Sequence, residues 1–463
     1  MRRFACCSLL AGLVLAGGWI TAAASAVHPP NSPVTVTAVS ISVNHREVFD
    51  GQCVVVSARA TNAVGSPVTG VRLQACVNGR PWCASQRTSP SGVVHILLPL
   101  PEVGANPITV RGAEVVSAPV MVQVKRRRFR IITDPDHLIG MEWEIWFGPG
   151  YATWGREEAM PVLGHYSSLD PRVLRQQTLW FNKMGINFVE VDWANNLTQP
   201  FPSPAAKECI AADKVLFNLY RHMRQHPKIV FLMGPEHNHW MNHTTPYTGP
   251  WYDAQLNYVY KHFIDNPKYK ELYLQYRGKP LLNLYLNGPR SAKPPDVHDP
   301  RFTIRYVGAW MQTTQENRYG VWSWYDQDPQ PTYFHGNKQD CVEALTVACG
   351  YPAINSPGPG LNNWLSPDAG GKNYGQTYRA QWRAAFRYQP RFLFLCQFNE
   401  FEHPDEYNNN LNNDMEPTLL SPPGSRRVGG WGFEYVNLTR REIARYHEVI
   451  TRSSERPANR ESR

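Results

Sequence analysis

The sequence predicts a β-sandwich followed by a (β/α)8 barrel, and three observations support this prediction. The chain has 463 residues, which is too long for one ordinary domain and enough for two or three. Residues 34–124 consist of short segments of alternating apolar and polar residues, interrupted by Gly, Pro, Asn and Ser, as is typical of a sandwich. After residue 130, apolar runs alternate with longer stretches of helical periodicity, which favours a barrel of parallel strands.

The first 26 residues have the features of a cleaved secretion signal. Arg2 and Arg3 supply the positive region, residues 9–20 the apolar region, and residues 24–26 an A-x-A cleavage site. A retained membrane anchor is the alternative, and the shortness of the apolar run disfavours it. We therefore expect a secreted or periplasmic protein that has no membrane association once the signal is removed.

The cysteines suggest local disulfides. Removing the signal takes away Cys6 and Cys7 and leaves seven of the nine cysteines. An exported protein can form disulfides, and an odd number leaves at least one thiol free. The candidate local pairs are Cys76 with Cys83 and Cys341 with Cys349.

Composition and charge limit the class of protein. A hydrophobic share of 42% and a charged share of 18% are typical of a soluble globular protein. The 15 Trp and 22 Tyr supply rings that suit stacking on sugars as well as core packing. The formal charge of +9 is partly local, because the segment "KRRRFR" (residues 125–130) carries five basic side chains. We expect a solvated linker there, with polyanion binding as the alternative. Without a nucleic-acid-binding module beside it, the segment does not predict nucleic-acid binding.

The predicted sandwich, residues 33–125, follows a proline-rich spacer. Its stretch "ATNAVGSPVTGVRLQACVNGR" and the later "SPSGVVHILLPLP" resemble bacterial immunoglobulin-like modules of the invasin type. The resemblance covers about 90 residues and implies an immunoglobulin-like sandwich that serves as a spacer or stalk.

The predicted barrel occupies residues 130–452, and residues 453–463 are expected to be a disordered tail. A doubly wound sheet fits less well, because no Gly-rich phosphate loop follows any strand. One expected helix starts with Asp170 as its N-cap and stops at Gly185, and two more are expected at residues 377–388 and 439–452. The eight expected strands are residues 141–147, 186–193, 228–234, 280–286, 303–310, 320–326, 343–350 and 391–401.

In a (β/α)8 barrel the active site lies at the C-terminal ends of the strands. These ends carry carboxylates, amides and aromatic rings, the mixture that glycoside hydrolysis needs. Taken singly, each such residue is more often a cap or a loop contact. The expected substrate-binding side chains are Glu142, Glu144, Asp192, Trp193, Glu236, His237, Trp310, Trp324 and Tyr351.

Three segments resemble glycoside hydrolase family 99. Residues 159–193, "AMPVLGHYSSLDPRVLRQQTLWFNKMGINFVEVDW", resemble the second-strand region of that family, and residues 389–401 and 412–446 resemble its last strand and terminal helix. The resemblance implies a barrel that acts on α-mannose-type linkages, is endo-acting and retaining, and needs no metal or cofactor. It further implies a substrate contact at Asp192 and a structural role for Glu416.

The family's catalytic motif, Asn-Glu-Trp-His-Glu, is only partly present. In the family the first Glu assists attack by the sugar's own hydroxyl, and the second is the acid/base. Asn399 and Glu400 match the motif, so the resemblance implies that Glu400 is catalytic and that Asn399 contacts substrate. His403 stands where the second Glu is expected. The acid/base is therefore open between Glu402, His403 and Glu406.

Three functions remain open at this point. The first is a glycoside hydrolase acting on a polysaccharide or oligosaccharide. The second is a carbohydrate-binding barrel that has lost catalysis, which the missing second Glu favours. The third is a metal-dependent hydrolase that uses Glu236, His237, His239 and His243, because imidazole and carboxylate are good zinc ligands.

Overall fold

In the computed structural model, residues 36–463 form the second of two units of the chain. The expected signal lies outside the described residues, and so does the expected tail beyond residue 455. Among the residues described, no helix is both long and apolar enough to cross a membrane. The structure describes residues 35–148, 154, 157, 159–194, 202, 204–234, 249–286, 293–308, 317–324, 326, 328–350, 371–401, 414–421 and 429–455.

The N-terminal part of the second unit is all-β and consists of two sheets. The first has the strand order β1-β3-β7, and the second has the order β2-β10-β8-β4-β5, with β6 on β4 and β9 on β8. Alternate residues such as Val54, Val56 and Ala58 are buried with Ile108 and Val110 in one core. The all-β prediction is confirmed, and the immunoglobulin-like assignment stays a prediction. The strands are β1 (Ala38–Val43), β2 (Glu47–Phe49), β3 (Cys53–Thr61), β4 (Arg72–Val77), β5 (Arg80–Pro81), β6 (Gln86–Arg87), β7 (Val93–Pro99), β8 (Gly104–Gly112), β9 (Val115–Val116) and β10 (Val120–Lys125).

Neither expected disulfide is formed, because all seven cysteines outside the signal are free. Cys341 and Cys349 flank β19 (Val342–Ala348) at opposite ends, and a strand of that length separates them by over ~20 Å. A disulfide needs Cα atoms within about 7 Å. Cys76 and Cys83 are close in sequence, but their thiols donate weakly to the carbonyls of Gln74 and Ala84 instead.

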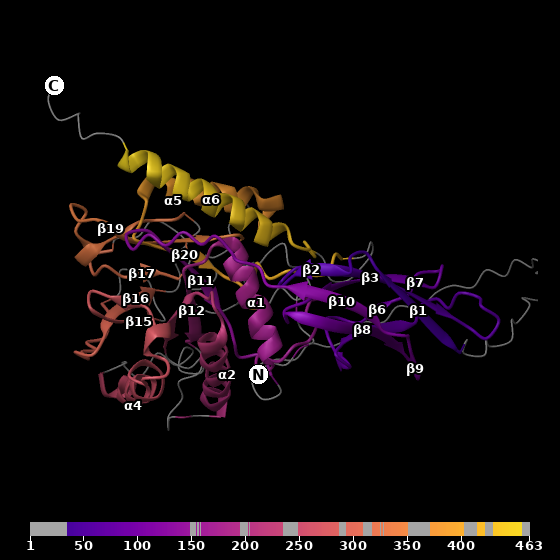
Figure 1. The fold of residues 1–463 in the computed structure, drawn as a ribbon. Helices are drawn as coiled ribbons and strands as arrows, with labels where there is room; N and C mark the ends of the chain where they lie inside the picture. Colours follow the sequence, from indigo (N-terminus) through magenta and orange to yellow (C-terminus); the bar gives the residue numbers. More distant parts are fainter. Residues whose placement is uncertain are drawn as a thin grey trace, which may run out of the picture. The chain divides into compact units, whose positions relative to one another are not determined.

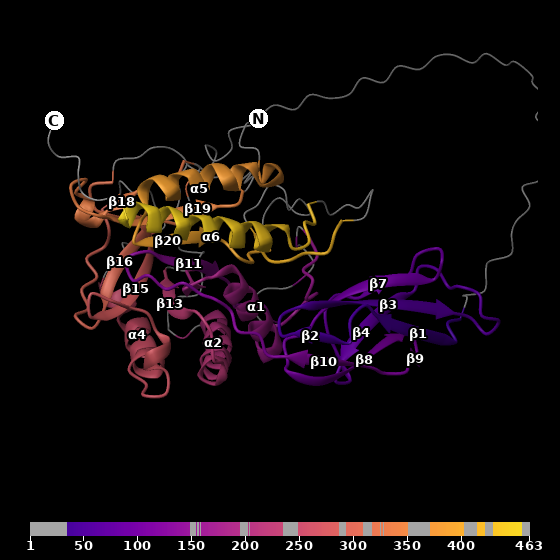
Figure 2. The ribbon, with the colours of Figure 1, turned by 45° about the horizontal axis from the view of Figure 1, so that its top comes forward.

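The C-terminal part forms a nearly closed barrel, whose strands and surrounding helices are labelled in Figures 1 and 2. Its sheet has the order β17-β16-β15-β13-β12-β11-β20-β19-β18, with parallel pairing from β17 through β19. Thr346 on β19 donates a hydrogen bond of 2.6 Å to the carbonyl of Ser323 on β17, which links the two ends of the eight-strand series. All eight expected strands correspond to observed ones: β11 (Leu138–Trp143), β12 (Phe188–Trp193), β13 (Lys228–Met233), β15 (Lys279–Leu286), β16 (Thr303–Gly308), β17 (Trp322–Ser323), β19 and β20 (Phe392–Cys396).

Helices cover the outside of this sheet. The Asp170 side chain accepts from the backbone N–H of Arg172, and Gly185 ends α1 with a φ of 97°, both as expected. Figures 1 and 2 show α6 beside α5, and α6 continues two residues beyond the expected end at 452. The described helices are α1 (Pro171–Met184), α2 (Pro204–His222), α4 (Gly249–Val259), α5 (Gln376–Tyr388) and α6 (Glu434–Ser454), with short irregular turns at Tyr260–Ile264, Lys270–Leu272, Phe334–Gly336 and Asn373–Gly375. The remaining short strands are β14 (Gln275–Tyr276), which pairs with β15, and β18 (Thr332–Tyr333), which pairs with β19.

The inside of the barrel has two chemically different levels. Phe188, Phe392 and Phe394 pack with other apolar side chains near the start of the strands. Farther along β12, the same face carries Glu190 and Asp192, because side chains of a strand alternate between its two faces. The barrel therefore has an apolar floor with a layer of carboxyl groups above it.

The basic segment between the two parts is anchored, which differs from the expected solvated linker. The backbone N–H of Arg127 donates to Asp50, at 2.7 Å. Gln225 both accepts from the N–H of Phe129, at 2.9 Å, and donates to its carbonyl, at 2.8 Å. The backbone of this segment is thus fixed, while its arginine side chains are exposed.

Gly140 on β11 provides a test of the barrel floor. A Cβ atom there would lie 2.2 Å from the ring of Phe188. We therefore expect Gly140→Ala to lower the free energy of unfolding by about 1–3 kcal/mol, the usual cost of overpacking a core. Chemical denaturation measures this loss.

The control is the same change in a Phe188→Leu background, where the clashing ring is absent. Most of the cost of Gly140→Ala should then disappear. An equal cost in both backgrounds would show that Phe188 is not what excludes a side chain at Gly140.

Candidate active site

Four carboxyl groups gather on the inner faces of β11 and β12. Glu142 on β11 pairs in register with Glu190 on β12, so these two side chains are neighbours across the sheet. Glu144 and Asp192 lie two residues farther along the chain. Glu142, Glu144 and Asp192 each present an oxygen within 4.8 Å of the others'. All four residues are buried.

Three of these carboxyls have defined hydrogen-bond donors. The indole N–H of Trp324 and the thiol of Cys396, the latter at 2.9 Å, donate to the two oxygens of Glu142. The backbone N–H of Ala194 donates to Asp192. Glu190 accepts from the side-chain amide of Asn283 at 2.5 Å.

Glu144 differs from the other three. Its side chain is 1% exposed, and neither carboxylate oxygen accepts a hydrogen bond from any residue that the structure describes. A buried ionised carboxylate without donors is costly. Glu144 is therefore the member of the cluster with the strongest reason to carry a proton.

Burial and mutual repulsion determine the protonation of the cluster. Burial raises the pKa of Glu142, Glu144 and Asp192 well above their usual values, and the neighbouring carboxylates raise each of them further. Burial also raises the pKa of Glu190 to about 7. Burial and repulsion therefore favour the protonated forms of these carboxyl groups.

Glu400 reaches this cluster from the end of β20 and is partly exposed. Its Oε2 accepts a hydrogen bond of 2.6 Å from the side-chain amide of Gln397, and its backbone N–H donates to Asp414 at 2.6 Å. The negative charge of Glu400 helps to raise the pKa of Glu144 and of Asp192. Glu400 is thus a partly exposed carboxyl that is electrostatically coupled to buried carboxyls of raised pKa.

Asn399, expected to contact substrate, is instead fully buried and ties two strand ends together. Its side chain accepts from the N–H of Glu144 at 3.0 Å and donates to the carbonyl of the same residue at 2.9 Å. It also donates to the hydroxyl of Tyr166 at 2.9 Å, which in turn donates to Glu416 at 2.7 Å. Asn399 therefore positions Glu144 and Glu400 relative to each other, and Glu416 has the structural role that was expected.

Trp193 also differs from its expected role. It lies on the face of β12 opposite Asp192 and is 0% exposed. Its indole N–H donates to Asp213 of α2 at 2.8 Å, and its ring packs on Phe231. Because neighbouring residues of a strand point in opposite directions, Trp193 serves core packing while Asp192 faces the site.

Trp324 is the one expected aromatic contact among the described residues that lies at the cluster. Its ring is partly exposed and makes an edge contact with Tyr285 at 5.9 Å between centroids. The other expected residues lie outside those that the structure describes; they are Glu236, His237, Trp310, Tyr351, Glu402, His403 and Glu406.

Sequence reasoning missed Glu190, Tyr285 and Cys396 as members of the site. The signal for Glu190 was present in "FVEVDW", where it stands two residues before Asp192 and so shares its face. Tyr285 and Cys396 carry no such local signal. They join the site only because the barrel closes around it.

Glu142, Glu144 and Asp192 are also the described residues that could hold a metal ion. Three carboxylate oxygens suit a hard cation such as Ca²⁺ or Mg²⁺ better than zinc. The histidine-rich segment considered for zinc, residues 236–243, lies outside the described residues.

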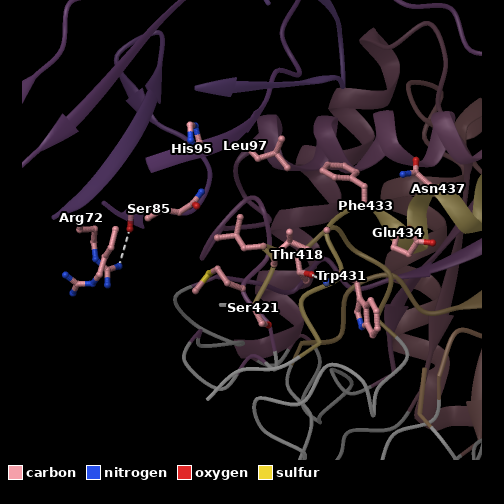
Figure 3. A pocket seen from close by; sticks show the side chains of 16 residues that line it. Arg72, Ser85, His95, Leu97, Thr418, Ser421, Trp431, Phe433, Glu434 and Asn437 are labelled. Atoms are coloured by element: carbon pink, nitrogen blue, oxygen red, sulfur yellow. Dashed lines mark hydrogen bonds between the residues drawn. The ribbon is translucent and has the colours of Figure 1, made fainter. Parts of the chain in front are cut away.

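A separate hollow of about 840 Å³ lies between the sandwich and the barrel. Figure 3 shows Arg72 and His95 on one side of it and Trp431 and Phe433 on the other. None of the clustered carboxylates lines this hollow, so the hollow is separate from the candidate active site.

Comparison with known proteins gave structural similarities only. No family model matches the sequence, and no curated protein matches it. The GH99 endo-alpha-mannosidase from Bacteroides thetaiotaomicron matches with 13% identity and a TM-score of 0.48, over 70% of this chain and 100% of that chain. A glycoside hydrolase-like protein matches with 13% identity and a TM-score of 0.43, over 68% and 96% of the two chains. The D0-D1 domain of Intimin matches with 12% identity and a TM-score of 0.16, over 19% and 47%. All three TM-scores lie below 0.5 and all identities below 25%, so neither the fold nor the chemistry of this chain is inferred from these matches.

Glu416 allows a test of the buried carboxyls. Burial raises its pKa to about 8. A carboxyl whose pKa is higher in the folded state stabilises the fold fully below its unfolded value, near 4.3, and this contribution disappears as the pH rises to about 8. We therefore expect Glu416→Gln to reduce the fall in unfolding free energy across this window by up to about 1.4 kcal/mol per pH unit.

Denaturant unfolding at several pH values between about 5 and 8 measures this slope. Glu434→Gln, on the exposed surface of α6, is the matched control and should keep the wild-type slope. An unchanged slope in Glu416→Gln would contradict the raised pKa.

Proposed function

We propose that this protein hydrolyses glycosidic bonds in an α-linked, mannan-type glycan and that Glu400 is a catalytic carboxylate. The observation that carries the proposal is the contrast between two coupled carboxyls. Glu400 is partly exposed at the end of β20, whereas Glu144 is buried, without a hydrogen-bond donor among the described residues, and has a raised pKa.

Glycoside hydrolysis uses two carboxyl groups in different states. One donates a proton to the leaving oxygen, and the other acts as an anion, either as nucleophile or as base. Environments that separate the pKa values of two neighbouring carboxyls create this division of labour. Glu142, Glu144 and Asp192 form a buried layer of carboxyls with raised pKa, and Glu144 and Asp192 of this layer are coupled to Glu400.

The candidates for the catalytic acid/base come from two lines of argument. Glu144 is the proton-holding candidate within the described residues. Glu402, His403 and Glu406 follow Glu400 closely in sequence and remain candidates from the resemblance to family 99. In that family's chemistry, Glu400 would assist attack by the sugar's own hydroxyl.

The nature of the glycan comes from the resemblance and from the aromatic content of the chain. Trp324 has a partly exposed ring, and its indole N–H donates to Glu142. The ring can therefore stack on a sugar beside the carboxyls. Glu236, His237, Trp310 and Tyr351 are proposed as further contacts. The proposal includes secretion or export to the periplasm, directed by the expected signal in the first 26 residues, and a spacer role for the sandwich.

A carbohydrate-binding protein without catalysis is the second candidate. Glu142 and Glu144 are each 1% exposed and Asp192 is 4% exposed, so direct contact between these carboxyls and a sugar needs the site to open. Binding of a glycan without any released product would favour this second function.

Glu400→Gln tests the proposed function directly. The substitution keeps the shape of the side chain and removes its charge, so we expect hydrolysis of α-linked mannans to fall by about 10²–10⁴-fold, as for loss of a catalytic acid or base. Product release measured by chromatography gives the rate, and glycan binding should be retained.

The control, Glu434→Gln, removes a glutamate from the exposed face of α6 and should leave the rate unchanged. Wild-type rates in Glu400→Gln would exclude Glu400 from catalysis. A wild-type protein that binds the glycan and never releases product would support the binding function instead.

A metal requirement is tested separately on the wild-type protein. We expect dialysis against EDTA to leave hydrolysis unchanged, because bound protons can neutralise the buried carboxyls without a metal cation. Loss of activity that Ca²⁺ or Mg²⁺ restores would contradict this and would assign a cation to Glu142, Glu144 and Asp192.

A further inference from the structure

The basic segment that follows the sandwich borders a hollow that none of the clustered carboxylates lines. The hollow has a volume of about 620 Å³ and lies between this segment, α1 and the end of α2. Five arginines line it, and no lysine does; they are Arg126, Arg127, Arg128, Arg175 and Arg224.

The walls of this hollow are fixed. Asp50 accepts from the backbone N–H of Arg127, and Gln225 pairs with the backbone of Phe129 through two hydrogen bonds. Arg175, near the middle of α1, donates from its Nε to the carbonyl of Pro101 at 2.8 Å. The backbone of the segment and the side chain of Arg175 are therefore fixed, and the arginines come to one hollow from three separate parts of the chain.

Positive charge in the hollow exceeds negative charge. Asp50 is the one carboxylate among the lining residues; it is 4% exposed, and its Oδ1 is occupied by the N–H of Arg127. Within the part of the chain that the structure describes, none of the five guanidinium groups takes part in an ion pair. Five arginines against one aspartate leave an excess of four positive charges.

Burial is the main cause that lowers the pKa of the Arg175 guanidinium. Asp50 raises this pKa by more than the charge of Arg126 lowers it, and Glu102 raises it further. The two carboxylates thus balance Arg126 at this position, and the excess positive charge of the hollow lies with its four exposed arginines.

We propose that this arginine cluster is a binding site for a ligand that carries two or more phosphate groups. The guanidinium group is a planar fork that matches phosphate oxygens with two parallel hydrogen bonds, which explains why the lining is arginine without lysine. A hollow of 620 Å³ lies within the range of small-molecule sites, about 300–1,000 Å³, so a compact oligophosphate fits it better than a long polymer. The site is independent of the proposed glycosidase chemistry.

Calorimetric titration of the full chain with inorganic tripolyphosphate tests the proposal. The wild type should bind it saturably, and binding should weaken as ionic strength rises. Arg126→Gln/Arg128→Gln removes two exposed guanidinium groups and should weaken binding by at least about tenfold, the equivalent of 1.4 kcal/mol.

The matched control is Arg383→Gln/Arg387→Gln, which removes the same charge from the exposed face of α5, away from the hollow. It should bind as the wild type does. No binding by the wild type, or an equal loss in both double variants, would overturn the proposal.

Two further probes identify the source of the phosphate groups. If the protein binds phosphatidylglycerol vesicles and tripolyphosphate displaces it from them, the site is supported and its ligand is a lipid headgroup. If the protein binds tripolyphosphate but no vesicles, the site is supported and its ligand is a free oligophosphate. Binding of a single-stranded oligonucleotide without binding of tripolyphosphate would overturn the compact site in favour of a nucleic-acid surface.

Discussion

The burial of several carboxyl groups in one layer of the barrel is the constraint on which the rest of the site depends. Glu142 and Glu190 face each other across paired strands above a floor of aromatic rings, with Asp192 and Glu144 beyond them. Crowding several carboxyls away from water disfavours their ionised forms, so the pKa of each is raised. Glu400 is partly exposed, and its charge raises the pKa of Glu144 in this layer. Asn399 keeps this relation fixed by bonding both to the backbone of Glu144 and to Tyr166.

Much of the fold was predictable because it follows local patterns. Most of the barrel strands are apolar runs long enough to recognise singly, although β17 has only two residues. The helix α1 is marked by its cap at Asp170, by Pro171 and by Gly185. The face on which a strand residue lies was harder to predict. Asp192 and Trp193 are adjacent in sequence, yet Asp192 faces the carboxyl cluster and Trp193 packs outside it against α2. The expected pairing of Cys341 with Cys349 was wrong, because the extended strand β19 lies between these residues and keeps them apart. Tyr285 and Cys396 meet the carboxyls only through barrel closure, which no local pattern contains.

The segment between sandwich and barrel shows how tertiary contacts change the meaning of a sequence feature. As a run of letters, "KRRRFR" is typical of a solvated linker. In the structure its backbone is bonded to Asp50 and Gln225, and Arg175 and Arg224, from distant parts of the chain, join its side chains around one hollow. A concentration of like charge that is held in place is a stronger indication of a ligand than the same charge on a mobile segment.

The central claim is that Glu144 is protonated at neutral pH and that Glu400 is one of the charges that keep it so. Infrared difference spectroscopy of protonated carboxyl groups, recorded as a function of pH, measures this most directly. The account predicts a protonated-carboxyl band at pH 7 that diminishes in Glu144→Gln and that disappears at lower pH in Glu400→Gln, because removing the charge of Glu400 lowers the pKa of Glu144. Absence of the band at pH 7, or an identical titration in Glu400→Gln, would contradict it.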